Sequence, residues 1–148
     1  MRILYTGFKG KNNTSSQLVA SLDAPTLLLT NSFQGLQREV EALNDEYDAV
    51  VMIGTDKALT KSIRFDLRAE NEGENFCSAY NIDPLIIKCN EMHIAYSVSI
   101  KPTQYLCNAA YWHMLQKNRN TIFMHIPSLK GMDAEFMCLL AEALKNNG

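Results

Sequence analysis

Four short apolar segments, each bounded by a glycine or a proline, constrain the fold of this chain more than any other feature. They cover residues 3–6, 26–29, 47–53 and 121–126. Runs of this length with such boundaries are typical of buried β-strands. Helical patterns separate the first three, at about 15–22 and from Asn31 or Ser32 to Leu43. This alternation predicts βαβ units. The expected fold class is therefore α/β, a three-layer α/β/α sandwich with a mostly parallel central sheet.

The pattern changes between residues 62 and 98, where the segments become shorter and richer in β-forming residues. Apolar and polar side chains alternate over 62–69, which predicts a half-exposed strand. A polar turn follows at 70–75. The runs 84–89 and 93–98 are expected to pair as a β-hairpin added to the sandwich.

Helical periodicity returns at Thr103 and again near the end of the chain. The last helix is expected to begin after Asp133 as its N-cap, with Met132 and Met137 in the two positions of a hydrophobic staple.

Length and charge limit the classes of function. The chain has 148 residues, 47% of them hydrophobic, so we expect a single domain over residues 1–148. Fourteen Lys and Arg against sixteen Asp and Glu give a formal net charge of −2, without a basic run. Nucleic-acid and membrane-surface binding therefore have no electrostatic basis. With no signal-peptide core and no apolar run of membrane-spanning length, we expect a cytoplasmic protein.

The cysteines do not follow a zinc-ligand or disulfide pattern. They are Cys77, Cys89, Cys107 and Cys138, without a CxxC or Cys/His spacing. In a reducing compartment we expect free thiols and no metal.

Cys107 is the first candidate for chemistry. It lies near the start of the helix that follows Pro102, where unpaired backbone N–H groups and the helix dipole favour an anion. A thiolate there would be stabilised, so the pKa of this thiol is expected to fall. The alternative is a small core residue between Leu106 and Ala109, because free cysteine is often buried.

His125 and Asp66 are the candidate partners of that thiol. His125 ends the strand at 121–126, and sites in parallel sheets are built at the carboxyl ends of strands. It could accept the thiol proton and pass it to a leaving amine. Asp66 could orient the imidazole. Alternatively, His125 is a packed sheet residue, and Asp66 is a surface carboxylate paired with Arg64 and Arg68.

The loop at residues 7–16 permits another interpretation. A strand, a loop containing Gly, Asn, Thr and Ser, and a helix N-terminus could cradle a phosphate, as in flavin or nucleotide sites. No glycine fingerprint or Walker pattern accompanies it. We therefore expect no cofactor.

Three segments together resemble the pyroglutamyl peptidase type I family, also called pyrrolidone-carboxylate peptidases. They are Ile3-Leu4-Tyr5-Thr6-Gly7-Phe8, Val98-Ser99 followed by Tyr105-Leu106-Cys107-Asn108, and Phe123-Met124-His125-Ile126-Pro127. The resemblance implies an α/β/α sandwich and a cysteine peptidase that removes an N-terminal pyroglutamyl group from peptides. It also implies a small peptide substrate with a blocked N-terminus, and possible homo-oligomers.

Residue by residue, the resemblance gives Cys107 as nucleophile, His125 as base and Phe8 as part of the substrate pocket. The family's glutamate aligns with Asp66 when Ala69 and Asn71 are matched, and with Phe65 when the alignment runs ungapped from Gly54. We prefer Asp66, because a shorter carboxylate can still orient an imidazole. The predicted catalytic set is therefore Cys107, His125 and Asp66.

The chain also departs from the family pattern. The first loop is shortened to Lys9-Gly10-Lys11-Asn12, and the alanine-glycine pair before the cysteine block is replaced by Pro102-Thr103. These changes affect the expected ring pocket and the backbone near the substrate carbonyl. The alternative hypothesis is therefore a catalytically inactive binding or assembly protein on the same scaffold.

Overall fold

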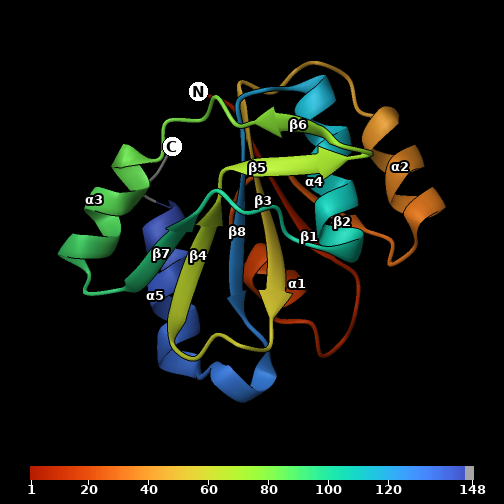
Figure 1. Cartoon of the computed structure of the whole chain (residues 1–148). Helices are drawn as coiled ribbons and strands as arrows, with labels where there is room; N and C mark the ends of the chain where they lie inside the picture. Colours follow the sequence, from red (N-terminus) through yellow and green to blue (C-terminus); the bar gives the residue numbers. More distant parts are fainter. Residues whose placement is uncertain (146–148) are drawn as a thin grey trace.

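The computed structural model describes residues 1–145 of the chain. Its centre is a six-stranded sheet with the order β2-β1-β3-β8-β4-β7 (Figure 1). The strands are β1 (Ile3–Phe8), β2 (Thr26–Leu29), β3 (Ala49–Asp56), β4 (Ser62–Asp66), β7 (Ala95–Ser99) and β8 (Thr121–Pro127). Strands β1, β2, β3 and β8 are parallel, whereas β4 lies antiparallel to β8 and parallel to β7. The predicted, mostly parallel sheet is confirmed.

Helices cover both faces of the sheet, as expected for a three-layer sandwich. Helices α1 (Thr14–Ala20) and α3 (Asp83–Glu91) each contact α5 (Ala134–Lys145) on one side, and α2 (Phe33–Glu41) contacts α4 (Tyr105–Lys117) on the other. Figure 1 shows α2 and α4 side by side, with α5 behind the sheet.

The central strands bury both of their faces, which explains their continuous apolar sequences. In β3, Val51 and Ile53 belong to one hydrophobic cluster, and Val50 and Met52 belong to the other. Successive side chains of a strand point to opposite faces, so a strand between two helical layers needs apolar residues at every position.

Side chains cap three of the helices. Asn13 accepts a hydrogen bond from the N–H of Ser15, and Ser32 accepts one from Gly35. The carboxylate of Asp133 accepts one from the N–H of Phe136, so the predicted N-cap of the last helix is confirmed.

The position of the predicted hairpin is wrong. Residues 84–89 lie in α3, where Pro84 stands in the first turn and Leu85 and Cys89, four residues apart, are buried. Residues 93–98 lead into the edge strand β7, which pairs in parallel with β4. The β-branched run favoured a strand, but the helical spacing of its two buried residues prevails in the tertiary structure.

The hairpin lies instead at the expected polar turn. Strands β5 (Arg68–Asn71) and β6 (Glu74–Cys77) are antiparallel and form a separate two-stranded sheet. Glu72 and Gly73 connect them with φ angles of 50° and 85°. Positive φ at both central residues is typical of the type I′ turn in two-residue hairpins. The expected strand over 62–69 is thus divided at Leu67 into β4 and β5.

Within the described residues, none of the helices is long and apolar enough to cross a membrane.

Candidate active site

Strand pairing brings His125 to the lining of a cleft. In the sheet register, His125 of β8 lies opposite Gly54 of β3 on one side and Arg64 of β4 on the other. The His125 side chain is buried, with 2% of its surface exposed, and its ring centroid lies 4.7 Å from that of Phe123. The carboxyl end of β8 therefore carries the histidine, as the sequence predicted.

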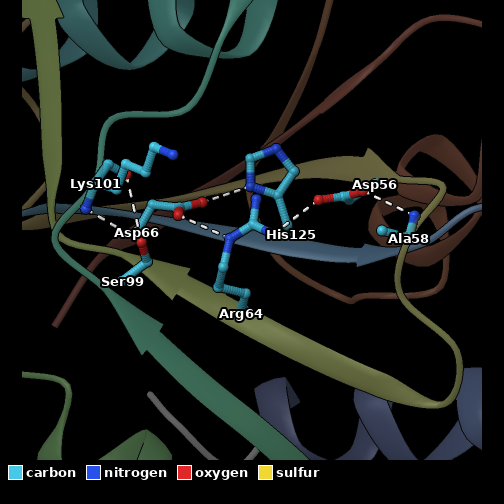
Figure 2. A network of polar contacts seen from close by, with 7 residues as sticks. All are labelled: Asp56, Ala58, Arg64, Asp66, Ser99, Lys101 and His125. Carbon is cyan, nitrogen blue, oxygen red and sulfur yellow. Dashed lines mark hydrogen bonds and ion pairs between the residues drawn. The ribbon is translucent and has the colours of Figure 1, made fainter.

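Asp66 holds this imidazole. Its Oδ2 lies 2.5 Å from Nδ1 of His125, and its side chain is 1% exposed (Figure 2). An ionised carboxylate can only accept hydrogen bonds, so Nδ1 carries the proton and Nε2 is left as the acceptor. The structure thus brings Asp66 to the histidine, whereas Phe65 is buried in the hydrophobic core.

Two further contacts fix Asp66. The Nε of Arg64 donates to its Oδ1 at 2.9 Å, and the hydroxyl of Tyr111 donates to its main-chain oxygen at 2.6 Å. Arg64 is thus a partner of Asp66, as the alternative interpretation of the sequence had it, but Asp66 is buried at the cleft and Arg64 is only partly exposed. A buried carboxylate needs such partners, because an unpaired charge away from water is costly.

Arg64 also joins Asp66 to Asp56, a residue that the sequence analysis did not single out. The Nη1 of Arg64 lies 2.7 Å from Oδ2 of Asp56, whose Oδ1 accepts a hydrogen bond from the N–H of Ala58. The Arg64 hydrogen bond holds the pKa of Asp56 below its usual value. Figure 2 shows the resulting chain, Asp56–Arg64–Asp66–His125. The sequence did carry a signal for Asp56, because this residue stands at the carboxyl end of an apolar strand, where sites in parallel sheets are built.

Cys107 stands in the first turn of α4 and lines the same cleft as His125 and Asp66. The backbone of Gly54 permits this approach. A Cβ added at Gly54 would lie 2.9 Å from Sγ of Cys107 and 2.9 Å from ring atoms of Phe123. Atoms almost never approach so closely, so the absence of a side chain at Gly54 makes room for the thiol.

The next residue, Asn108, anchors the start of α4. Its Oδ1 accepts a hydrogen bond from the N–H of Glu70 at 3.0 Å, and its Nδ2 donates to the Glu70 carbonyl at 2.7 Å. The helix is thus tied to the β5–β6 hairpin by both polar atoms of one side chain. Gln104, the N-cap residue, makes no side-chain cap hydrogen bond. The side chain of Gln104 therefore leaves the first N–H groups of α4 uncapped.

The predicted low pKa of Cys107 is wrong for the protein without substrate. The pKa of this thiol is raised to about 12, chiefly by burial and then by the carboxylates of Asp66 and Asp56, while Arg64 acts in the opposite direction. Loss of hydration and two nearby anions outweigh the attraction of the helix N-terminus for a thiolate. The resting cysteine is therefore a protonated thiol.

The cleft that contains these groups has a volume of about 810 Å³. Besides Cys107, His125 and Asp66 it is lined by the ends of β3 and β7 and by the segment before α4, including Lys57, Ser99 and Lys101 to Gln104.

Phe8 is not brought into this cleft. Its side chain is 4% exposed and belongs to the hydrophobic cluster on the α2 and α4 side. Its predicted contact with a substrate ring gains no support from this placement and stays a prediction.

The polar groups of the loop before α1 form hydrogen bonds with neighbouring protein groups. Ser15 Oγ accepts a hydrogen bond from the N–H of Phe8, and Oδ1 of Asn13 accepts one from the N–H of Ser15. Thr14 donates its hydroxyl proton to the carbonyl of Pro127. A phosphate cradle at this loop is therefore not supported.

Fold and site together define an α/β sandwich in which a cysteine, a histidine and an aspartate line one cleft. Comparison with solved structures gives the particular fold, which is that of the pyrrolidone carboxyl peptidases. The enzyme from Thermus thermophilus matches with a TM-score of 0.78 and 19% identity, over 97% of this chain and 96% of that chain. The enzyme from Thermococcus litoralis matches with a TM-score of 0.75 and 16% identity, over 97% and 91%. The enzyme from Fervidobacterium islandicum matches with a TM-score of 0.74 and 17% identity, over 99% and 95%.

No protein-family model matches the chain, and no curated protein matches it by sequence. The similarity to the peptidases thus lies in the fold, at sequence identities below 20% in these three structures.

Proposed function

We propose that the chain is a cysteine hydrolase that cleaves the amide bond of a pyroglutamyl or related small acyl group. The observation that carries this proposal is the 2.5 Å contact between Asp66 and His125 in the cleft that Cys107 lines. A buried carboxylate that fixes the tautomer of a histidine, in a cleft that a thiol also lines, is the arrangement expected of a nucleophile and its base. The fold shared with pyrrolidone carboxyl peptidases supports this choice of substrate class.

In the proposed reaction, Nε2 of His125 takes the proton of the Cys107 thiol as Sγ attacks the amide carbonyl carbon. The S–C bond forms, and the C–N bond breaks when His125 returns that proton to the departing amine. A water, deprotonated by His125, then adds to the thioester carbonyl and releases the acid and the thiol. The imidazolium formed in each step is stabilised by Asp66.

The raised pKa of the thiol determines when it ionises. Because the resting thiol is protonated, the thiolate forms during attack, by proton transfer to His125, rather than as a standing ion pair. In this mechanism the N–H groups at the start of α4, which the Gln104 side chain does not cap, bind the oxygen of the tetrahedral intermediate.

The raised pKa of Cys107 also favours a second candidate, a binding protein on this scaffold whose thiol is inert. One experiment separates the two. Turnover of pyroglutamyl-aminomethylcoumarin would be measured for the native chain, for Cys107→Ala and for His125→Ala, with Cys138→Ala as the control. Cys138 is exposed and does not line the cleft.

The hydrolase proposal requires that the native chain and Cys138→Ala turn over this or another small acyl-amide, and that Cys107→Ala and His125→Ala do not. Activity retained in Cys107→Ala would refute the mechanism. No turnover, together with a Cys107 that alkylates no faster than in His125→Ala, would favour the binding protein.

A further inference from the structure

The positive charges of the cleft exceed what its own carboxylates neutralise. Asp66 is paired with His125 and Arg64, and Asp56 is paired with Arg64 and with the N–H of Ala58. Lys57 and Lys101 also line the cleft, and both are exposed. Within residues 1–145, neither lysine forms an ion pair with a carboxylate.

The two lysines approach the cleft from different elements. Lys57 directly follows β3, and Lys101 lies in the segment between β7 and α4. Ser99 sets the turn at Lys101, because its hydroxyl oxygen accepts a hydrogen bond from the Lys101 N–H at 3.1 Å. In Figure 2 the ammonium group of Lys101 extends toward the side on which the His125 ring lies.

The start of α4 adds to the positive electrostatic potential of the cleft. The helix dipole places partial positive charge at Tyr105 and Leu106, and the side chain of Gln104 does not cap the helix. Charges of one sign focused by the walls of a cleft raise the local concentration of opposite ions. Lys57, Lys101 and the start of α4 therefore line the same cleft as Cys107.

We infer that the cleft selects a small amide that carries a carboxylate close to its scissile bond, with Lys57 and Lys101 as the groups that bind the carboxylate. That the ligand is an amide rests on the proposed function. Binding of a carboxylate by the two lysines does not require that the chain is an active hydrolase. A neutral pyroglutamyl amide would leave both ammonium groups without a partner, whereas a short acyl-peptide with a free terminal carboxylate would supply one.

The test compares two alkylating reagents of similar size, iodoacetate and iodoacetamide, which differ by one negative charge. Both react with the same thiolate, so the fraction of ionised Cys107 cancels in the ratio of their rates. The exposed Cys138 serves as the reference thiol in the same molecule. We expect the iodoacetate to iodoacetamide ratio at Cys107 to be about ten times that at Cys138 at low salt.

Lys57→Gln/Lys101→Gln should bring this ratio close to that of Cys138, and added salt should reduce it in the native chain. The matched control is Lys11→Gln/Lys130→Gln, which removes two exposed lysines that do not line the cleft. An equal ratio at both cysteines, or a ratio that the double lysine variant leaves unchanged, would overturn the inference.

A binding measurement covers the case in which Cys107 reacts with neither reagent. Pyroglutamyl-alanine and pyroglutamyl-alanine amide would be titrated into Cys107→Ser by calorimetry. The inference requires that the acid binds at least about five times tighter than the amide and that Lys57→Gln/Lys101→Gln abolishes the difference. Equal binding, or binding of neither, would overturn it. Equal hydrolysis of both by the native chain would overturn the anionic subsite while supporting the hydrolase.

Discussion

The Nδ1 atom of His125 lies 2.5 Å from Oδ2 of Asp66, although 59 residues separate the two in the sequence. Antiparallel pairing of β4 with β8 makes this contact, because it places Arg64 opposite His125 and Asp66 opposite Phe123. The carboxylate thus reaches the imidazole from the neighbouring strand. Arg64 and Tyr111 hold it there through an ion pair and a hydrogen bond.

Asp66→Asn is expected to lower kcat/KM by about 10²–10⁴-fold, because an amide can donate to Nδ1 and so place the imidazole proton on Nε2. The measurement is turnover of the small acyl-amide found in the substrate assay. Urea unfolding should show a chain that still folds, with a loss of about 1–3 kcal/mol from the weakened contacts to Arg64 and His125. Asp45→Asn, an exposed change, is the control. A kcat/KM within a factor of about three of the native value would contradict the orienting role of Asp66.

The two ends of the Asp56–Arg64 pair should move the pKa of Cys107 in opposite directions. The Asp56 carboxylate raises the pKa of this thiol, so Asp56→Asn should lower it from about 12. Arg64 lowers the pKa, so Arg64→Met should raise it further. At one alkaline pH, Cys107 should therefore alkylate faster in Asp56→Asn and slower in Arg64→Met than in the native chain. Shifts in the same direction in both variants would show that the cleft charges do not control the thiol.

Gly54→Ala tests the close approach of α4 to the sheet. The new methyl group would lie 2.9 Å from Sγ of Cys107 and from the Phe123 ring, so the helix start or the ring must move. We expect a loss of about 1–3 kcal/mol in unfolding free energy and a marked loss of activity. Gly73→Ala is the comparison, since a Cβ there meets no atom within 4 Å and its cost comes from the φ of +85°. Full activity in Gly54→Ala would mean that the thiol position is not tightly constrained.

Asn108→Ala should loosen the β5–β6 hairpin from α4. The variant removes two hydrogen bonds to Glu70, worth about 1 kcal/mol each. Hydrogen exchange at the Glu70 amide should accelerate, while exchange in β1 stays unchanged. Asn44→Ala, which lies away from the hairpin, is the control. Unchanged protection at Glu70 would contradict the anchoring role of Asn108.

The sequence by itself determined the layered α/β architecture and the candidates for chemistry. Runs such as residues 27–29 and 49–53 are apolar at every position, which favours strands covered on both faces. The place of His125 followed from the rule that sites form at the carboxyl ends of parallel strands. The N-cap at Asp133 was readable because capping is a local interaction of one side chain with the next turn.

Only the tertiary structure decided the path of the chain between residues 62 and 99 and the environment of the thiol. The helix α3 depends on the burial of Leu85 and Cys89 against the core, which outweighs the local preference for a strand. The pKa of Cys107 depends on burial and on Asp66 and Asp56, which come from other strands. The position of Cys107 near a helix N-terminus, taken alone, predicted a lowered pKa. Local sequence records propensities and periodicity, whereas solvation and charge at a site are sums over groups that only the folded chain brings together.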